Sequence, residues 1–510
     1  MTTRRAATAD PVAPGRGRRT SAMPPPAGGP AGVGLGAALL PLVRRALRRD
    51  EPSLVSCTAV LPAADPIDVF AAALPLGLEP RLWLAPADRF ALVGIGAAHE
   101  IRATGSLRFR AAASSWMEIL RGADVADDGA RARGTGPVLL GGFPFATAEI
   151  TSLPADPAAP WTGFENGSLV LPRLLVTAAG KDAWLTANVA LPPRGAKDRE
   201  AAAMAAIAEL DATRATVVDR ARTHVPLTQA STDLVEATEV SDGAEAAWDA
   251  AVIRLAGAVG RGRVDKVVLA RRVDVAADRP IDVPAVLRRL EASEPESTIF
   301  AVVRGERTFL GATPERLVRS EGHEFRTMAL AGSIGRGADD AEDVRLGAVL
   351  SASEKEREEH RVVVEMLRDT LAPLAVRLDI DPSPGVVRLR HIQHLMTPIT
   401  GRTREQAGIL DLVERLHPTP AVGGAPRELA LALLAEEEHL DRGWYAGPLG
   451  WLDGESDGEF VVAIRFGVVD GPRASLFAGC GIVADSEPDR EWEESRVKLR
   501  ALASAIGRPT

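Results

Sequence analysis

Short apolar runs bounded by turn residues recur through most of this chain, and runs of this length favour β-strands over helices. The first half is expected to hold strands at about 81–85, 90–94, 138–143 and 168–172, followed by an alanine-rich helix at about 198–218. The second half is expected to hold strands at about 266–273, 297–304, 308–310, 447–452, 459–469 and 475–482, and helices that begin near Ser353 and cover 491–500. The pattern therefore predicts a mixed α and β protein with strands in both halves.

The domain organisation follows from length and composition. With 510 residues, 46% of them hydrophobic, the chain can bury one large core or two ordinary ones. Residues 1–35 are rich in Pro, Gly, Ala and Arg and are expected to form a disordered tail. The remainder is expected to divide into an N-terminal half, 36–240, and a second half, 241–510, joined by the weakly periodic stretch 227–242.

Charge and cysteine content argue against several classes of protein. The net charge is −9 and no basic stripe follows the tail, so the folded part is not expected to bind nucleic acid. Cys57 and Cys480 are the only cysteines, too few for a disulfide framework, which fits a reducing cytoplasm. The apolar stretch 33–43 is shorter than a membrane span, so a soluble cytoplasmic protein without a membrane partner is expected.

Arginine supplies nearly all of the positive charge, which makes each lysine informative. Among the 60 basic residues the lysines are Lys181, Lys197, Lys266, Lys355 and Lys498. Arginine keeps its proton near neutral pH, whereas a partly buried lysine can lose it and act as a general base. Lys266 lies in the dense run 265–271 and is therefore the first candidate for a general base.

Two pairs of glutamates occur at helical spacing in the second half. Glu356 and Glu359 are three residues apart, as are Glu491 and Glu494, so each pair projects from one face of its helix. Taken alone, the run 354–361 is more often a solvated helix face. If the pairs converge, however, they need a cation, and Mg²⁺ suits carboxylates better than zinc, for which no Cys/His cluster is present.

A series of motifs surrounds these residues in a fixed order. The motifs are Lys266-Val-Val-Leu-Ala-Arg271, Gly311-Ala-Thr-Pro-Glu-Arg-Leu317, Leu330-Ala-Gly-Ser333, the Glu356/Glu359 helix, His417-Pro-Thr-Pro-Ala-Val-Gly-Gly424, Val461-Val-Ala-Ile-Arg465 and Phe477-Ala-Gly-Cys-Gly-Ile-Val483 with Glu491-Trp-Glu-Glu494. In this order they resemble the chorismate-utilising enzymes, a family that includes anthranilate, aminodeoxychorismate, isochorismate and salicylate synthases. The resemblance is strong over about 245–503 and looser over 50–225, where 140–145 and 161–164 fit the isochorismate synthase branch.

The resemblance implies a fold, which the apolar pattern alone does not specify. The family fold is one large α+β domain in which two orthogonally packed antiparallel β-sheets are covered by outer helices, with the active site between the sheets. The resemblance also implies that no separate glutaminase subunit is needed. Members of the isochorismate synthase branch are often monomeric, so a monomer is expected.

The resemblance also implies an activity. Members of the family that add water keep a lysine at the position of Lys266, whereas members that use ammonia typically lack it. The segment 417–421 looks like that of isochorismate synthases, since salicylate and anthranilate synthases tend to begin it with Phe-Pro-Ala. The implied reaction is a Mg²⁺-dependent conversion of chorismate to isochorismate. Lys266 would take a proton from the attacking water, and Glu315 would protonate the departing 4-hydroxyl.

The remaining site residues are carried over from the same resemblance. Glu359 and Glu494 would bind Mg²⁺ directly, and Glu356 and Glu491 through water. The groups expected around the substrate carboxylates and ring are Gly332, Ser333, Ala421, Tyr445, Arg465, Gly479, Cys480, Gly481 and Lys498. Cys480 departs from the alanine that is common in the family, and Arg316 follows the acid where an apolar residue is frequent. His391, His394 and His417 are expected to be structural or to shape the pocket.

Three alternatives stay open at this point. A salicylate synthase would form isochorismate and then eliminate pyruvate. An anthranilate-type aminating synthase is disfavoured by Lys266, and a non-catalytic chorismate or metal-binding regulator is disfavoured because the base, the acid and both glutamate pairs occur together. The pathway, menaquinone or siderophore biosynthesis, is likewise open.

Overall fold

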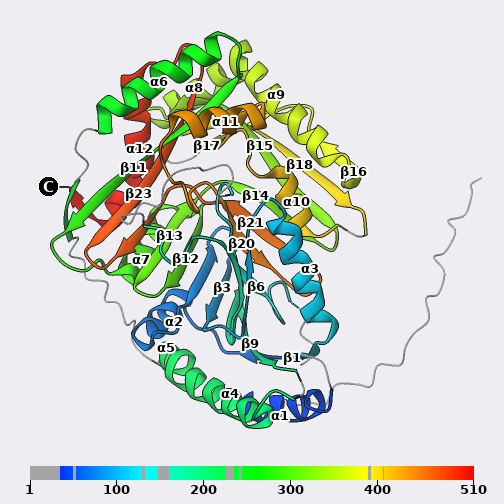
Figure 1. Cartoon of the computed structure of the whole chain (residues 1–510). Coiled ribbons are helices and arrows are strands. Elements are labelled where there is room, and N and C mark those ends of the chain that lie inside the picture. The colour runs from blue at the N-terminus through cyan, green and yellow to red at the C-terminus, as the bar shows by residue number, and fades with distance from the viewer. Residues whose placement is uncertain are drawn as a thin grey trace, which may run out of the picture. The chain divides into compact units, whose positions relative to one another are not determined.

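The expected strands form, and they pair into two large sheets (Figure 1). The computed structural model describes residues 35–49, 53–127, 132–147, 160–193, 195–223, 235–239, 244–388, 392–405 and 407–509, and every structural statement below concerns these residues. They belong to one compact unit, which is bounded by Gly34 and Thr510.

The larger sheet has 14 strands within the described ranges. Its order is β24 (Gly507–Pro509), β10 (Val235–Glu239), β11 (Lys266–Ala277), β23 (Arg473–Ile482), β22 (Phe466–Asp470), β13 (Arg307–Thr313), β12 (Thr298–Arg304), β2 (Arg81–Ala85), β3 (Phe90–Ile95), β8 (Leu174–Ala179), β9 (Asp182–Leu191), β1 (Ser53–Leu61) and β5 (Asp124–Asp127), with β19 (Gly424–Ala425) paired to β11.

The smaller sheet has 10 strands in the same described part of the chain. Its order is β16 (Ala375–Ile380), β18 (Ile392–Thr403), β15 (Glu324–Gly335), β14 (Arg316–Glu321), β21 (Gly458–Val462), β20 (Pro448–Leu452), β6 (Leu139–Gly142), β7 (Gly167–Leu171) and β4 (His99–Ala103), with β17 (Gly385–Arg388) paired to β18. Most neighbours are antiparallel; β1 with β5 and β10 with β24 are parallel.

Both sheets combine strands from the two halves of the sequence. In the larger sheet β2 pairs with β12, and in the smaller sheet β6 pairs with β20. Neither half can therefore complete its sheets alone. The predicted α+β class with two mainly antiparallel sheets is confirmed.

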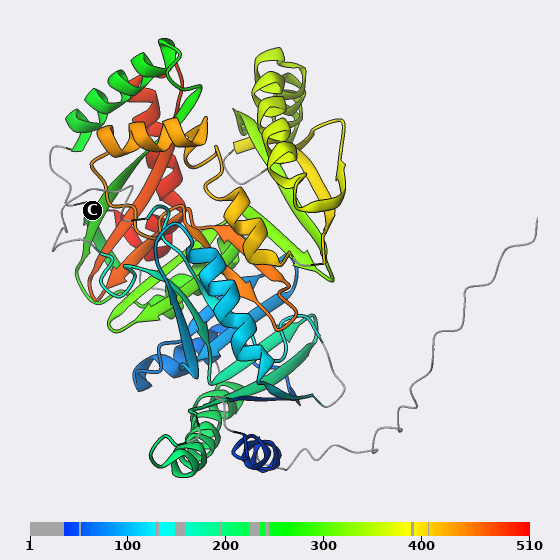
Figure 2. The same ribbon diagram turned by 45° about the vertical axis from the view of Figure 1, so that its right-hand side comes forward.

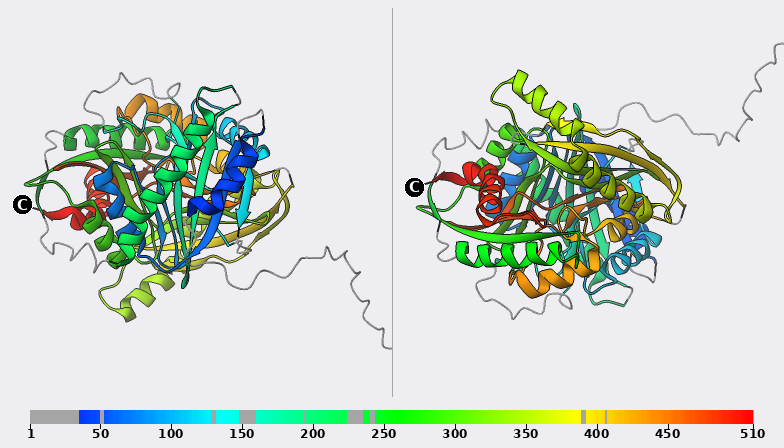
Figure 3. Two further views of the ribbon diagram at one scale, coloured as in Figure 1. Left: turned by 90° about the horizontal axis from the view of Figure 1, so that it is seen from below. Right: turned by 90° about the horizontal axis from the view of Figure 1, so that it is seen from above.

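Helices cover the sheets on their outer sides. They are α1 (Leu35–Ala46), α2 (Pro66–Ala73), α3 (Arg108–Arg121), α4 (Arg199–Thr213), α5 (Asp219–Thr223), α6 (Ala244–Gly260), α7 (Val283–Ser293), α8 (Asp340–Ala352), α9 (Glu354–Leu371), α10 (Ile409–Leu416), α11 (Arg427–Glu437) and α12 (Pro488–Ile506). The helix expected at 198–218 ends as a π-helical turn, Arg214–Val218. Seen from below, α1 and α4 lie across strands of the N-terminal half (Figure 3, left).

An aromatic core holds the two sheets together. The ring of Trp451 on β20 lies 5.5 Å from that of Phe90 on β3, so the sheets touch directly there. Phe309 on β13 lies 5.4 Å from Phe300 and 4.5 Å from Phe466. Fully burying one such side chain stabilises the fold by roughly 1.5–3 kcal/mol. The outer face of the larger sheet packs a second, mainly aliphatic core against α1, α2, α4, α7 and α12.

The prediction of one strand over 459–469 is wrong. The run divides into β21 in the smaller sheet and β22 in the larger sheet, and the chain crosses between them at Ala463, Ile464 and Arg465. Arg465 has φ of +53°, a left-handed conformation that ends the strand. The crossing is invisible in the sequence because both strands are buried on both faces, so the apolar pattern continues through it.

Two further expectations concern segments near the ends of the halves. Most of the joint expected at 227–242 lies outside the described residues, but 235–239 forms β10, an addition to the larger sheet that the weak periodicity did not predict. The expected tail, 1–35, also lies outside them except for Leu35, which begins α1. Within the described ranges no helix combines the length and apolar character that a membrane crossing requires.

Candidate active site

Lys266 is the first residue of β11, and its side chain lies over the neighbouring strand β23. A Cβ atom at Gly481 of β23 would come within 2.5 Å of Lys266 Cε and 3.1 Å of its Nζ. Glycine at this position therefore leaves the space that the lysine occupies. The Nζ atom reaches Glu359 on α9, 3.3 Å from its Oε1.

Glu315 lies in the short link between β13 and β14 and is held by its backbone. Its amide donates to Thr313 Oγ1 at 3.2 Å, and its carbonyl accepts from the Val462 amide at 3.0 Å. The carboxylate accepts a hydrogen bond from Thr419 Oγ1 at 3.4 Å, and both residues line a cavity of about 30 Å³ together with Ala421. Burial raises the pKa of Glu315 to about 7, although Thr419, Lys498, Arg465 and Lys266 all act to lower it.

Arg465 and Lys498 bring positive charge to the same carboxyl. Arg465 lies in the crossing between β21 and β22, where Gly311 gives it room because a Cβ there would come 2.8 Å from the Arg465 carbonyl oxygen. Burial lowers the pKa of Arg465, while Glu294 and Glu315 oppose the shift. Lys498 Nζ lies 2.7 Å from Glu494 Oε1 and 2.8 Å from the Gly479 carbonyl oxygen. Anions of a substrate would meet these two cations.

The two glutamates of α12 lie together beside Cys480. Among the described residues, Cys480, Glu491 and Glu494 form the one group of three potential metal ligands, with their atoms within 4.8 Å of one another. Burial raises the pKa of Glu491, which accepts from Ser486 Oγ at 2.8 Å. Burial acts the same way on Glu494, but Lys498 outweighs it and the pKa of Glu494 is lowered.

The two glutamates of α9 face the site from the other side. Figure 2 shows α9 and α12 in separate parts of the upper end of the molecule. Glu359 is paired with Lys266, and Glu356 Oε2 accepts from the Ser333 amide at 3.0 Å. Glu359 and Glu494 thus each form an ion pair with a lysine.

A bulge in β15 places the expected ring-carboxylate residues. The pairing of β15 with β18 shifts register between Ala331 and Ser333, and Gly332 adopts φ of +74°. A Cβ at Gly332 would come 3.0 Å from the Glu356 carbonyl oxygen, so glycine allows α9 to approach the bulge. Ser333 Oγ lies 2.9 Å from His394 Nδ1, and burial lowers the pKa of His394 to about 4.

Gly479 of β23 lies against Tyr445. The part of β23 that holds Gly479 and Gly481 extends past the residues that pair with β22. A Cβ at Gly479 would come 2.7 Å from the Tyr445 hydroxyl oxygen. Lys498 binds the Gly479 carbonyl, so the backbone N–H and C=O groups of Gly479 point away from β11. These groups alternate in direction along an antiparallel strand, so those of Gly481 point the same way as those of Gly479. The same alternation points the Cys480 amide toward β11. The amides of Gly479 and Gly481 therefore point away from β11, and the amide of Cys480 does not.

The histidines behave as structural residues where the structure describes them. His417 is buried, its Nε2 lies 2.8 Å from the Phe145 carbonyl oxygen, and burial lowers its pKa to about 3. A neutral ring of this kind holds the start of the 417–424 segment in place. His391 lies outside the described residues.

A buried ion pair, missed by the sequence analysis, ties the site together. Arg442 and Glu438 pair at 2.5 Å and are both almost fully buried. Arg442 donates to the carbonyl oxygens of Val268 at 2.5 Å and Val422 at 2.8 Å, and Glu438 accepts from the Ala270 amide at 2.8 Å. The pair therefore fixes β11 against the 417–424 segment. Its Glu-x-x-x-Arg spacing is that of an ordinary surface pair, so the sequence carries no signal of its burial.

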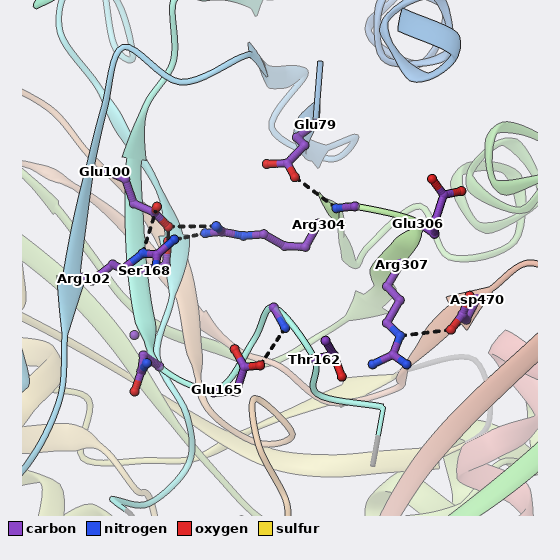
Figure 4. Close-up of a pocket in the computed structure, with 14 residues that line it drawn as sticks. Glu79, Glu100, Arg102, Thr162, Glu165, Ser168, Arg304, Glu306, Arg307 and Asp470 are labelled. Carbon is purple, nitrogen blue, oxygen red and sulfur yellow. Dashed lines mark hydrogen bonds and ion pairs between the residues drawn. The ribbon is translucent and has the colours of Figure 1, made fainter. Parts of the chain in front are cut away.

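A larger pocket of about 610 Å³ lies elsewhere, at the hairpin between β12 and β13 (Figure 4). Its arginines, Arg102, Arg304 and Arg307, each pair with a carboxylate. Arg304 pairs with Glu100 at 2.8 Å and also binds Ser168. Arg307 pairs with Asp470 at 3.0 Å. None of the expected site residues lines this pocket.

The chemistry of the donors fits a hard divalent cation. The Cys480 thiol donates to the Glu491 carbonyl oxygen at 3.2 Å, and burial raises its pKa to about 12, so the thiol is protonated when no metal ion is bound. The carboxylates beside it are oxygen donors of the kind that Mg²⁺ prefers, whereas zinc sites are built mostly from nitrogen and sulfur ligands. Glu491 and Glu494, with Glu359 and Glu356 opposite, could hold the ion.

Comparisons with known proteins find relatives that are similar along most of the chain. A family model described as "chorismate binding enzyme" matches residues 41–507. The chain is 34% identical over 475 residues to the isochorismate synthase MenF of Bacillus subtilis, covering 92% of this chain and 97% of that protein. It is 38% identical over 464 residues to a protein of Pseudomonas aeruginosa named salicylate biosynthesis isochorismate synthase, covering 90% and 91%. The structure of MenF, a menaquinone-specific isochorismate synthase from Escherichia coli, superimposes with a TM-score of 0.71 at 25% identity, covering 92% and 99%.

Proposed function

This chain belongs to the chorismate-binding enzymes, and from that premise we propose that it is an isochorismate synthase. The enzyme adds water at C2 of chorismate and releases the C4 hydroxyl. The observation that carries the proposal is that Lys266 lies close enough to a partly buried, protonatable acid, Glu315, to act on its pKa. Relatives that are similar over nine-tenths of the chain carry the same name.

Glu315 serves as the general acid. A carboxyl with a pKa of about 7 is half protonated near neutral pH and can give its proton to a departing hydroxyl. The C4–O bond breaks, the oxygen leaves as water, and Glu315 becomes a carboxylate. In the reverse direction the same carboxylate takes the proton from a water that adds at C4, so one group serves both directions.

Lys266 serves as the general base. The Nζ atom takes a proton from the water whose oxygen bonds to C2, and the ring double bonds shift as the C4–O bond breaks. In the structure Lys266 is paired with Glu359 at 3.3 Å, so it must leave that carboxylate and be a neutral amine before it accepts a proton from water. Proton exchange with solvent after product release restores both groups. One water enters and one leaves, so the equation balances.

The glutamates of α9 and α12 would hold Mg²⁺, Glu359 and Glu494 directly and Glu356 and Glu491 through water. When bound, the ion supplies positive charge that stabilises the ring carboxylate and the conjugated system. The direct ligands proposed are the two glutamates that bind lysines in the structure. A cation and the lysines therefore compete for the same carboxylates.

The substrate's two carboxylates have separate sites in this proposal. Gly332 and Ser333, at the bulge beside Glu356, receive the ring carboxylate. Arg465, Lys498 and the amides of Gly479 and Gly481 receive the enolpyruvyl carboxylate, with Cys480 and Tyr445 closing that end. Ala421 lies near the C4 side because it lines the cavity that Glu315 also lines.

A salicylate synthase is the nearest alternative, because it begins with the same water addition. The test is the product that purified enzyme makes from chorismate and Mg²⁺ near neutral pH, resolved by HPLC. The proposal expects a mixture of chorismate and isochorismate with little salicylate, and no anthranilate when ammonium is added. Salicylate and pyruvate as the main products would replace the proposal with the alternative.

The setting of the enzyme completes the proposal. It acts in the cytoplasm as a monomer, without a glutaminase subunit, in menaquinone or siderophore biosynthesis. The two full-length relatives are named for isochorismate and for salicylate biosynthesis, so they do not choose between the pathways. Mass photometry of the purified chain would test the monomer, and isochorismate formation by the chain alone would test its independence from a partner.

A further inference from the structure

The acid Glu315 has one hydrogen-bond donor to its carboxylate among the described side chains, and that donor is Thr419. A tight turn orients Thr419, because its carbonyl oxygen accepts from the amides of Val422 at 3.1 Å and Gly423 at 2.9 Å. The turn is anchored by His417, which is bound to the Phe145 carbonyl. The Thr419 hydroxyl thus has a defined position 3.4 Å from Glu315 Oε1, where a modest rotation strengthens the bond.

The cavity beside the two side chains is lined mostly by apolar residues. Of the other polar residues in its lining, Thr327 donates its hydroxyl to the Leu317 carbonyl oxygen and Arg316 pairs with Glu459. The cavity of about 30 Å³ that they share is walled by Leu330, Val363, Leu367 and Leu416. A cavity of this size holds about one water molecule, and such a water needs polar partners, which Glu315 and Thr419 supply. A carboxylate that forms here gains its hydrogen bonds from Thr419 or from that water.

The charged groups that face Glu315 lie on its other sides. They are Lys266 from β11, Arg465 from the crossing between β21 and β22, and Lys498 from α12, with the Tyr445 phenol also nearby. Arg316, the next residue in the chain, is turned away and pairs with Glu459 at 2.6 Å. None of the three cations hydrogen-bonds to Glu315 within the described part of the chain, so Thr419 is the group that can direct its carboxyl.

We infer that Thr419 is a positioning residue for the acid: its hydroxyl directs the Glu315 carboxyl toward the substrate and stabilises the carboxylate that forms once the proton has gone to the leaving oxygen. The inference rests on the proposed function, because it assumes that Glu315 is the acid. It explains how a half-buried carboxyl can both give a proton and take one back. Valine has the shape of threonine without the hydroxyl, and serine keeps the hydroxyl without the methyl group.

The test compares Thr419→Val and Thr419→Ser with the unchanged enzyme, using pH profiles of kcat and KM in both directions. Thr419→Val should lower kcat on the order of 10-fold with little change in KM, because a hydrogen bond to a charged group is lost. Without that bond the protonated acid persists to higher pH. The alkaline limb of the forward reaction and the acid limb of the reverse reaction should therefore both move to higher pH, and Thr419→Ser should restore both.

Two results would overturn the inference. One is a Thr419→Val enzyme with unchanged profiles. The other is a loss of kcat that moves neither limb or that serine does not rescue, which would indicate a purely structural role. Thermal unfolding of each variant checks its folding, and Thr419→Ala, which also lacks the hydroxyl, supplies the answer if valine does not fold. Glu315→Gln is measured alongside. If it keeps full turnover, the acid assignment itself fails; if it is inactive while Thr419→Val is normal, only the role of Thr419 fails.

Discussion

In two charged clusters of this molecule, the pKa of a partly buried glutamate is shifted in opposite directions. At the β12–β13 hairpin, burial would raise the pKa of Glu100, but hydrogen bonds from Ser168 and Arg304 lower it to about 2 (Figure 4). At the candidate active site burial prevails, and the pKa of Glu315 rises to about 7. Glu100 is held as an ion by direct contacts, whereas the cations around Glu315 act across a distance.

This contrast indicates which charged groups are available to move a proton or bind an ion. The hairpin pocket measures about 610 Å³ and the cavity beside Glu315 about 30 Å³, so the proposed acid lies beside much the smaller of the two. Paired charges in the hairpin pocket are already stabilised and have little left to offer a reacting group. Unpaired or exchangeable charges, such as Glu315 and the lysine-bound glutamates, keep the capacity to move a proton or bind an ion.

The largest expected effect comes from removing the cation. Chelation with EDTA should abolish isochorismate formation, and Mg²⁺ should restore it, because the glutamate pairs cannot hold the substrate's ring carboxylate without a positive ion. Among variants, Glu359→Gln and Glu494→Gln should lower kcat/KM by about 10²-fold or more, and Glu356→Gln and Glu491→Gln by about 10-fold. Equal turnover with and without divalent metal would contradict the magnesium site.

The next effect concerns the base. Lys266→Gln should lower kcat by roughly 10² to 10⁴-fold, because glutamine cannot take a proton from water, while chorismate should still bind. Turnover is measured by HPLC and binding by calorimetry. Lys181→Gln is a matched control, since Lys181 is exposed in the turn between β8 and β9 and should leave both unchanged. Near-normal isochorismate formation by Lys266→Gln would remove Lys266 from this role.

The sequence predicted the parts of the site that depend on local pattern. Helical spacing placed each glutamate pair on one face, and short apolar runs located most of the strands, including β11 and β23, which carry Lys266 and the glycines. These features need only neighbouring residues, so they are visible in one dimension. The ordered motifs added the family and its fold, which the apolar pattern left open.

The parts that were missed depend on contacts between distant segments. The crossing at Arg465 follows from the need to join two sheets, and no local signal separates β21 from β22. The burial of the Arg442–Glu438 pair depends on β11 lying against the 417–424 segment. Thr419 resembles any threonine in a proline-rich turn until the fold brings it to Glu315, 104 residues away in the chain.

A smaller effect is expected at the hairpin pocket, and it should be on stability rather than activity. Glu100→Gln leaves Arg304 without its carboxylate partner, and the side chains are only 22% and 11% exposed. The unfolding free energy near pH 7 should fall by about 2 kcal/mol, while kcat stays within about twofold. Because its folded pKa is lowered, Glu100 stabilises the enzyme above the ordinary glutamate pKa and loses that effect as the pH falls toward 2. Loss of activity without loss of stability would break the contrast between the two clusters.

An effect of comparable size and opposite sign is expected at the acid. The folded state resists ionising Glu315, so the residue costs stability as the pH rises from the ordinary glutamate pKa through about 7, and the full cost applies above that. Glu315→Gln removes the ionisable group and should raise the unfolding free energy by about 1 to 3 kcal/mol at pH 9, with no gain at pH 4, where glutamate is protonated in both states. Urea unfolding at the two pH values measures the difference, and Glu100→Gln should show the opposite sign at pH 7. If the variant and the unchanged enzyme are equally stable at both pH values, solvent or the nearby cations already stabilise the ionised carboxylate. Only the metal site would then distinguish charged groups that take part in the reaction from charged groups that stabilise the fold.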